Sequence, residues 1–270
     1  MVEAMSTAEK YVSDYLRRKS ILLTSSEQEE VNRRVYRNIE IKFRIKLSRK
    51  ILRTELFGSC ARGTNLPKKY DPNTDLDVLV IFNDDSYDRT PETYRNVLRD
   101  LVESSLNVRT VKKKHPAVVI EQDSVNVDLV PCVLEDDDYL IPAADNKWRD
   151  TDPHDYTNIV ADHDEAEQDH LRRLIRLLKY WNVQRNERFD AFELEMQIID
   201  SFCPGDSFAE EFFDVVDSLD GSDLSQTSAQ YLDGLKSDAE WLQKYMQDAN
   251  TRKIEERLSR IFPGHAFTPW

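Results

Sequence analysis

The sequence predicts an α+β protein in which a lobe built on a sheet is followed by a helical lobe. Two observations indicate this class. In the first half of the chain, short apolar segments typical of strands alternate with amphipathic helical segments, whereas the chain after Pro153 has almost only helical periodicity. The length of 270 residues is sufficient for one large domain or two closely associated lobes, with ample chain for a core. We expect the first lobe to comprise residues 1–160 and the second residues 161–270.

Two capping boxes predict helices near the N-terminus. The motifs Ser6-x-x-Glu9 and Ser26-x-x-Glu29 each precede apolar residues at helical spacing. Residues 39–47 also alternate strictly between apolar and polar side chains, which is a strand signal. We favour a long helix here that leads to a short strand at Thr54–Phe57.

The remaining elements follow from apolar runs and helical spacing. Three buried strands are expected at Asp75–Phe82, Val118–Ile120 and Val125–Val133, with a helix that begins at Pro91. The second half is expected to contain five helices, which are Glu165–Arg185, Phe192–Phe202, Ser207–Leu219, Ser228–Gln247 and Arg252–Ile261.

The composition excludes several classes of protein. With 51 acidic and 37 basic residues, the net charge of −14 argues against a protein that coats nucleic acid by bulk electrostatics. A hydrophobic content of 40% is too high for a disordered acidic chain. The longest purely apolar run, Val78–Phe82, is far shorter than the roughly 18 residues that a membrane span needs. Because no secretory signal or disulfide framework is visible, we expect a cytoplasmic protein without a membrane partner.

The charge is distributed unevenly along the chain. The segment Arg33–Arg53 holds nine basic residues and one acid, whereas Glu135–Asp169 holds thirteen acids and two basic residues. Such runs are usually solvated surface. The functional alternative is that the Arg33–Arg53 segment forms a basic face that receives a polyphosphate or an activator.

Three aspartates form the candidate metal site. Asp75 and Asp77 project from the same face of their expected strand, because side chains alternate along a strand, and Asp128 lies on another expected strand. If these strands are neighbours, the three carboxylates converge and repel one another unless protons or divalent cations compensate. Oxygen ligands suit Mg²⁺ or Mn²⁺. Two such ions roughly 3.5–4 Å apart can stabilise the attacking and leaving oxygens of a phosphoryl displacement.

The Gly58-Ser59 turn is a candidate phosphate-binding loop. It follows the short apolar segment Leu56-Phe57. Glycine lets the backbone approach an anion closely, and a helix that begins at Ser59 would direct free N–H groups at a phosphate. The Ser59 hydroxyl adds one more donor.

These motifs together resemble those of the nucleotidyltransferase superfamily typified by DNA polymerase β. Within it, the segments GSCARGTNLP, DLDVLVIF, VNVDLVP and RLIRLLKYWN are most similar to the bacterial CD-NTases, which are relatives of cyclic GMP–AMP synthase and oligoadenylate synthase. The resemblance extends from about Ile51 to Glu195, with a weaker similarity at Arg260–Gly264. It implies a bilobal polymerase β-type fold, with a mixed-sheet catalytic lobe and a helical lobe that completes the nucleotide-binding cleft.

The resemblance implies specific roles for the aspartates. Asp75 and Asp77 would bind both of two Mg²⁺ ions, with Mn²⁺ as a possible substitute. Asp128 would bind one ion and activate the acceptor hydroxyl.

The resemblance also implies a set of nucleotide-binding residues. Gly58, Ser59 and Lys179 would hold the donor NTP, with the Lys179 ammonium on its triphosphate. A lysine on the polar side of a helix is otherwise usually solvated. Arg62 and Thr64 belong to the motif and either contact the nucleotide or support the loop.

One position departs from the family pattern. A serine that touches the triphosphate commonly precedes an aromatic residue after the Lys179 helix, but Ala191 precedes Phe192 here. A phosphate contact is therefore missing or replaced. Phe192 is expected either to stack on a base or to fill the core, and the core is the more frequent place for an aromatic side chain.

The implied activity is the joining of NTPs into a cyclic oligonucleotide with release of pyrophosphate. By resemblance, the product would be a second messenger in bacterial anti-phage (CBASS-type) signalling, which activates an effector that this chain does not bind directly. One alternative is a nucleotidyltransferase that modifies an RNA end, a protein or a small molecule. Another is a catalytically idle sensor that binds nucleic acid on Arg33–Arg53, and that face could instead receive a nucleic-acid or protein activator.

Overall fold

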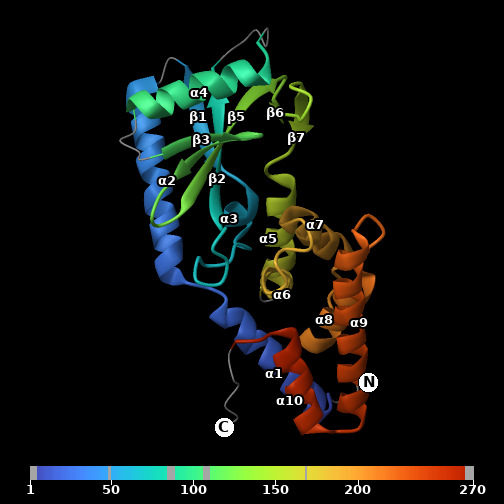
Figure 1. Ribbon diagram of the computed structural model, residues 1–270. Helices are drawn as coiled ribbons and strands as arrows, with labels where there is room; N and C mark the ends of the chain where they lie inside the picture. Colours follow the sequence, from blue (N-terminus) through green and yellow to red (C-terminus); the bar gives the residue numbers. More distant parts are fainter. Residues whose placement is uncertain (1–4, 48–49, 84–88, 106–109, 168, 265–270) are drawn as a thin grey trace. The chain divides into compact units, whose positions relative to one another are not determined.

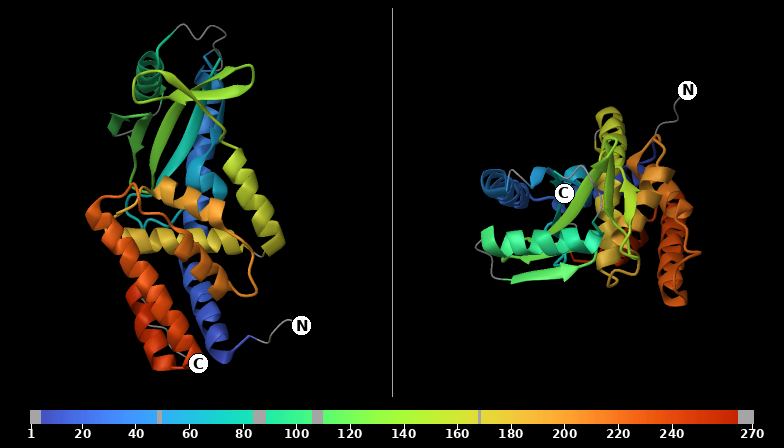
Figure 2. Two further views of the ribbon diagram at one scale, coloured as in Figure 1. Left: turned by 90° about the vertical axis from the view of Figure 1, so that its right-hand side faces the viewer. Right: turned by 90° about the horizontal axis from the view of Figure 1, so that it is seen from above.

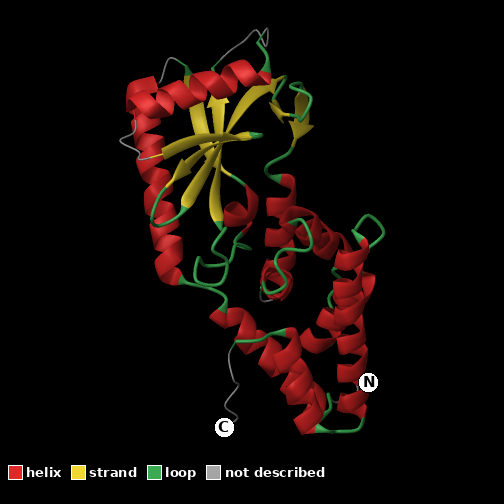
Figure 3. Cartoon of the chain, in the orientation of Figure 1, coloured by secondary structure: helices red, strands yellow, loops and turns green. Residues whose placement is uncertain are grey.

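The computed structural model describes residues 5–47, 50–83, 89–105, 110–167 and 169–264. The chain forms two compact units (Figure 1). The helical unit comprises Met1–Thr24 and Ile159–Trp270, and the sheet unit comprises Ser25–Asn158. The α+β class expected from the sequence is confirmed, with all strands of the described chain in the sheet unit (Figure 3). No described helix is both long and apolar enough to cross a membrane.

The sheet unit is built on seven strands. Its elements are α2 (Ser26–Leu47), β1 (Ile51–Leu56), α3 (Gly58–Arg62), β2 (Asp75–Phe82), α4 (Pro91–Ser105), β3 (Thr110–Lys114), β4 (Ala117–Glu121), β5 (Asn126–Glu135), β6 (Asp138–Pro142) and β7 (Trp148–Thr151). The strand order is β1-β2-β5-β4-β3, and β6 pairs with both β5 and β7. The β2–β5 pair is parallel, and the other pairs are antiparallel.

The long helix expected after the second capping box is confirmed as α2. Its cap lies one residue earlier than expected, because the Ser25 hydroxyl accepts the Gln28 N–H at 3.2 Å. Ile39 and Phe43 are buried at helical spacing, whereas Ile45 is 74% exposed. A buried helical stripe therefore prevails over the alternation of residues 39–47, and the following strand begins at Ile51 rather than Thr54.

The two faces of the sheet differ. One face packs against α2 and α4 and holds the larger core, which includes Phe43 and Leu98 from the helices and Leu76, Val78 and Val80 from β2. The helix α4 runs alongside the sheet (Figure 2). The other face carries a smaller apolar cluster, which includes Leu79, Ile81, Val130 and Cys132. Because side chains alternate along a strand, Asp75, Asp77 and Asp128 belong to this second face.

The helical unit contains elements from both ends of the chain. They are α1 (Thr7–Leu22), α6 (His170–Val183), α7 (Ala191–Ser201), α8 (Phe208–Ser218), α9 (Gln226–Gln247) and α10 (Thr251–Ile261), and α5 (Asp155–Glu167) begins in the sheet unit. The division expected from the sequence assigned the first helix to the sheet lobe. In the structure α1 packs on α6 and α8, and the Ser13 hydroxyl accepts the Ala209 N–H at 3.1 Å. The helix α1 therefore groups with the helical unit.

Two further differences from the expected elements have local causes. The single helix expected over Glu165–Arg185 is wrong, because α5 ends at Glu167 and α6 begins at His170. Asp169 between them has a φ of +63°, a left-handed backbone that cannot continue a helix.

Strands β3, β6 and β7 were not expected from the sequence. The Trp148–Thr151 strand, for example, has no buried residue and therefore lacks the apolar alternation of a half-buried strand.

Candidate functional site

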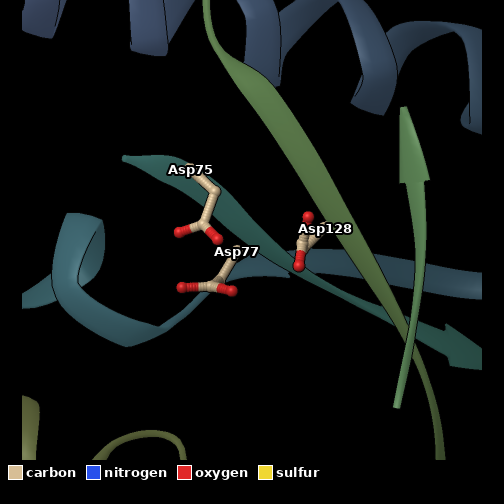
Figure 4. A group of neighbouring side chains, drawn as sticks. All are labelled: Asp75, Asp77 and Asp128. Carbon is tan, nitrogen blue, oxygen red and sulfur yellow. The ribbon is translucent and has the colours of Figure 1, made fainter. Parts of the chain in front are cut away.

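The parallel pairing of β2 with β5 brings the three aspartates together. Asp77 lies directly opposite Asp128, and Asp75 lies opposite Asn126. Each of the three side chains offers a carboxylate oxygen, and these oxygens lie within 4.8 Å of one another (Figure 4). The sequence-based expectation that the three carboxylates converge is thus confirmed.

The oxygen donors of this acidic triad suit a divalent cation. Burial raises the pKa of the Asp128 carboxyl above its ordinary value, and the Lys114 ammonium partly offsets this effect. A cluster that consists only of carboxylates is a donor set for Mg²⁺ or Mn²⁺. The three residues therefore fit the divalent ions that the resemblance implies, with Asp75 and Asp77 from one strand and Asp128 from its neighbour.

The turn at Gly58 is built against Asp77. Gly58 has a φ of +67°, and a Cβ atom there would lie 2.3 Å from the Asp77 Oδ2 atom. The Phe57 N–H donates to the Asp77 carbonyl at 3.2 Å, which holds the turn on β2. Only glycine satisfies both the backbone conformation and the close approach, so Gly58 and Ser59 lie beside the triad.

The residues after the turn stabilise it. The Thr64 N–H donates to the Ser59 carbonyl at 2.9 Å, and Thr64 is completely buried. Arg62 is 5% exposed and ends the short helix α3. The sequence left open whether Arg62 and Thr64 contact the nucleotide or support the loop. Burial of both side chains favours support of the loop.

Cys60 has a structural part, which agrees with the packing role expected for it from the sequence. Its thiol donates to the Asp75 carbonyl at 3.4 Å, and it accepts a hydrogen bond from the Asn32 side chain of α2 at 3.6 Å. The cysteine therefore connects α3 and α2 to the strand that carries the triad. No sequence motif marks this contact, since the partners are far apart in the chain.

Lys179 belongs to the helical unit, where it forms a buried ion pair. Its ammonium contacts the Glu195 carboxylate, and the residues are 8% and 0% exposed. Lys179 lies on α6 and Glu195 on α7, so the pair connects two helices. Glu195 was missed at the sequence level because a glutamate on a helix carries no signal of its partner.

Phe192 and Ala191 lie at the start of α7. Phe192 is 53% exposed, so a place in the core is wrong for this side chain. Ala191 is the first residue of α7, and the Asp190 side chain accepts the Phe192 and Glu193 N–H groups at 2.9 and 3.1 Å. Asp190 therefore caps the helix beside the position where the family pattern has a serine.

The candidate residues thus fall into two sets. Asp75, Asp77 and Asp128 lie in the sheet unit with the Gly58–Thr64 turn. Lys179 and Phe192 lie in the helical unit.

A family match identifies the chain. Residues 5–163 match the family described as the Second Messenger Oligonucleotide or Dinucleotide Synthetase (SMODS) domain. The chain belongs to the SMODS family. The match begins before the motif region at Ile51 and confirms the resemblance to the CD-NTases that those motifs indicated.

Individual relatives of this SMODS chain are distant. A probable cyclic nucleotide synthase of Bacillus cereus is 21% identical over 184 residues, which is 54% of each chain. A CCA-adding enzyme of Saccharolobus islandicus is 31% identical over 153 residues, 54% of this chain and 34% of the relative. The chain therefore spans about half of the first relative and a third of the second.

The fold has a known counterpart over nearly its whole length. A structure of E. coli MS115-1 CdnC with ATP matches with a TM-score of 0.73 and 14% identity, covering 95% of this chain and 99% of that one. CdnC in complex with HORMA gives the same TM-score, at 17% identity over 95% and 98% of the two chains. At these identities the likeness concerns the fold, and it agrees with the polymerase β-type architecture.

Proposed function

We propose that this protein is a metal-dependent nucleotidyltransferase that joins NTPs into a cyclic oligonucleotide and releases pyrophosphate. The observation that carries this proposal is the acidic triad, in which three carboxylates converge within 4.8 Å beside a glycine turn. Membership of the SMODS family supports the class of product.

The triad would hold the ions beside the reacting groups. Asp75, Asp77 and Asp128 would supply the carboxylate ligands for two Mg²⁺ ions. When bound, the ions neutralise charge on the phosphates and on the oxygens that attack and leave. The acceptor ribose hydroxyl attacks the α-phosphorus in line, a new P–O bond forms, and the bond to the β-phosphate oxygen breaks so that pyrophosphate leaves. The Asp128 carboxylate accepts the hydroxyl proton as the general base.

The other residues position the donor. The Ser59 hydroxyl and the backbone of the Gly58 turn donate hydrogen bonds to its phosphates. Lys179 supplies an ammonium for the triphosphate, and Glu195 keeps that ammonium in place before the nucleotide arrives. The exposed Phe192 ring offers a surface for a base. Ala191 has no hydroxyl, so position 191 does not supply the phosphate contact that the serine of the family pattern makes.

A transfer to an RNA 3′ end is the second candidate function. The identity of 31% to the CCA-adding enzyme favours it. The net charge of −14 opposes it, because a long RNA would be repelled by the chain as a whole. The same reaction on a protein or a small molecule would use the same triad.

The proposal includes a cytoplasmic signalling role. The cyclic product would act as an anti-phage second messenger on an effector that this chain does not contact. An activator would bind the basic face of α2, where Arg34, Arg37 and Arg44 are exposed together with Ile41. An exposed isoleucine among arginines favours a protein activator, and the HORMA complex of CdnC is a precedent for such a partner.

The decisive experiment is incubation of the purified chain with each α-³²P-labelled NTP, and with all four, in Mg²⁺ or Mn²⁺. We expect small phosphatase-resistant products, which chromatography and mass spectrometry identify. The variant Asp75→Asn/Asp77→Asn should reduce product by at least about 10³-fold, since it removes metal ligands. The control Asp136→Asn/Asp137→Asn removes the same charge from an exposed turn and should leave activity unchanged. Label on RNA or protein would instead support the second candidate, and equal activity in the two variants would refute catalysis by the triad.

A further inference from the structure

A pocket with a volume of about 290 Å³ lies at the end of β2 that is remote from the acidic triad. Strand β2 begins at Asp75, in the triad, and ends at Phe82, which lines the pocket. At about 3.3 Å per residue, the two sites are separated by roughly 20 Å along the strand. Phe82 also belongs to the core on the face opposite the triad. The pocket is therefore distinct from the candidate catalytic site, and α4 lies toward this end of β2 (Figure 1).

The rim of the pocket carries two cations. Lys50 follows α2 and Arg89 precedes α4, and both residues are exposed. The Asn83 amide and the Thr93 hydroxyl complete the polar part of the lining. Among the described residues that line the pocket, none is acidic. This donor set matches an anion with several oxygens.

Hydrogen bonds fix the backbone beneath both cations. The Asn83 N–H donates to the Lys50 carbonyl at 2.9 Å. The Trp148 indole N–H donates to the Arg89 carbonyl at 3.3 Å. The two positive side chains therefore extend from anchored segments.

The floor of the pocket is apolar and closely packed. Phe82 and Tyr94 pack edge to face with ring centroids 4.9 Å apart, and Tyr94 packs on Trp148 at 5.3 Å. Phe82 and Tyr94 are 6% and 2% exposed, so they offer ring edges rather than a stacking face. Such a floor excludes water beneath a flat or compact ligand.

The backbone at the start of α4 does not supply the anion site. The Glu92 N–H donates to the Asn146 side chain at 2.9 Å, and the Thr93 N–H donates to the Thr90 carbonyl at 2.9 Å. Pro91 has no N–H. Anion recognition in this pocket therefore depends on side chains, of which Lys50 and Arg89 carry the positive charge.

We propose that this pocket binds a compact phosphate-bearing molecule, with its phosphate between Lys50 and Arg89. A phosphate dianion matches two cations better than a carboxylate does, and arginine and lysine are both suited to phosphate oxygens. The volume is at the lower end of the range for small-molecule sites, about 300–1,000 Å³, so the ligand is no larger than a mononucleotide. The source of the phosphate is either free orthophosphate or a nucleoside monophosphate, whose ring would lie over the Phe82–Tyr94 floor.

The experiment uses calorimetric titration of the full chain with AMP, sodium phosphate and adenosine, all in EDTA. Without a divalent ion the triad repels phosphate, so the titration reports the pocket even if the chain proves catalytically inactive. We expect binding of AMP, no binding of adenosine, and amide chemical-shift changes at Asn83 and Thr93. If orthophosphate binds as tightly as AMP, the free anion is the ligand. If orthophosphate binds more weakly than AMP, the nucleoside monophosphate is the ligand.

Two variants separate the pocket from bulk charge. Lys50→Gln/Arg89→Gln should lower AMP affinity by at least about tenfold, because it removes both charge-assisted contacts. Lys10→Gln/Arg252→Gln makes the same charge change on exposed residues of the helical unit and should have no effect. Absence of binding by both AMP and orthophosphate, or an equal loss of AMP affinity in the two variants, would overturn the proposal.

Discussion

Gly58 lies so close to Asp77 that no side chain fits between the phosphate-loop candidate and the triad. The contact depends on the absence of a side chain at residue 58, since a Cβ atom there would lie 2.3 Å from the Asp77 carboxylate. Gly58 also adopts a left-handed φ of +67°, which other L-residues rarely adopt. A substitution therefore moves a triad carboxylate or the loop itself.

Gly58→Ala should reduce nucleotidyltransferase activity by at least about 100-fold, because a misplacement of about 1 Å at a reacting centre has an effect of that size. It should also lower the free energy of unfolding by about 1–2 kcal/mol from the left-handed backbone alone. The control is Gly234→Ala on α9, where nothing lies within 4 Å of the added Cβ. That variant should stabilise the protein by about 0.5–1 kcal/mol. Urea denaturation and initial rates measure both effects, and equal behaviour of the two variants would contradict this account.

Asp128 should make the metal-free protein less stable as pH rises. Because burial raises its folded-state pKa, ionisation costs more in the folded than in the unfolded state. Its stabilising contribution is therefore complete below the ordinary pKa of about 4 and is lost as pH rises through the raised value. In EDTA at pH 7, Asp128→Asn should have a higher melting temperature than the wild type, and the difference should disappear near pH 3–4. A control, Asp136→Asn in an exposed turn, should show no such pH dependence. A lower melting temperature for Asp128→Asn than for the wild type at pH 7 would contradict a destabilising burial of the ionised Asp128 carboxylate.

At the scale of elements, the Lys179–Glu195 pair connects α6 to α7. Both side chains are buried, so each charge depends on the other for compensation. The exposed Arg252–Glu256 pair on α10, at 3.0 Å, is the natural comparison because its members are 88% and 62% exposed. The two pairs have similar chemistry and very different solvation.

Glu195→Gln should lower the free energy of unfolding by about 3–5 kcal/mol, since it leaves the Lys179 ammonium buried without a counter-charge. Glu256→Gln should cost no more than about 0.5 kcal/mol. The double variant Lys179→Met/Glu195→Leu should recover most of the stability. If Lys179 also binds the donor, that double variant will still have a raised KM for NTP; an unchanged KM would leave Lys179 a purely structural role.

The helix α2 shows why one element could be assigned only by weighing two patterns. Its sequence has both helical spacing and, over residues 39–47, strict alternation. As a helix, the segment buries Ile39 and Phe43 in the core and leaves Ile41 and Ile45 46% and 74% exposed. Tertiary packing on the sheet therefore selects the pattern that buries more apolar surface.

At the scale of the whole molecule, the net charge of −14 has two different origins. Part of it is the triad, where negative charge is concentrated for a cation. Much of the rest lies on exposed positions such as Glu135–Asp138. Any added salt screens the second kind, whereas only a divalent ion of suitable size satisfies the first.

Mn²⁺ or Mg²⁺ should therefore raise the melting temperature of the wild type beyond the effect of NaCl at equal ionic strength. Above the Kd of the ion for the folded protein, the stabilisation grows with the logarithm of the ion concentration. It reaches about 2.7 kcal/mol at 100 times Kd. Asp75→Asn/Asp77→Asn should lose this specific part and keep the general salt effect. An equal response of wild type and variant in differential scanning calorimetry would show that no divalent ion binds at the triad.

The sequence by itself determined the parts of the site that depend on local periodicity. Alternation along one strand puts Asp75 and Asp77 on one face, the Ser6 hydroxyl caps the start of α1, and the glycine turn follows β1. Each of these depends on residues a few positions apart, whose backbone geometry is set locally.

Only the tertiary structure decided the relations between distant residues. Three such relations connect different elements of the chain. They are the β2–β5 register that sets Asp77 opposite Asp128, the ion pair between Lys179 and Glu195, and the grouping of α1 with the helical unit. Register and packing follow from which apolar faces are buried together, and no local pattern encodes the partner. Edge strands such as β7 were missed for the same reason, since they are formed by pairing with β6 rather than by their own apolar alternation.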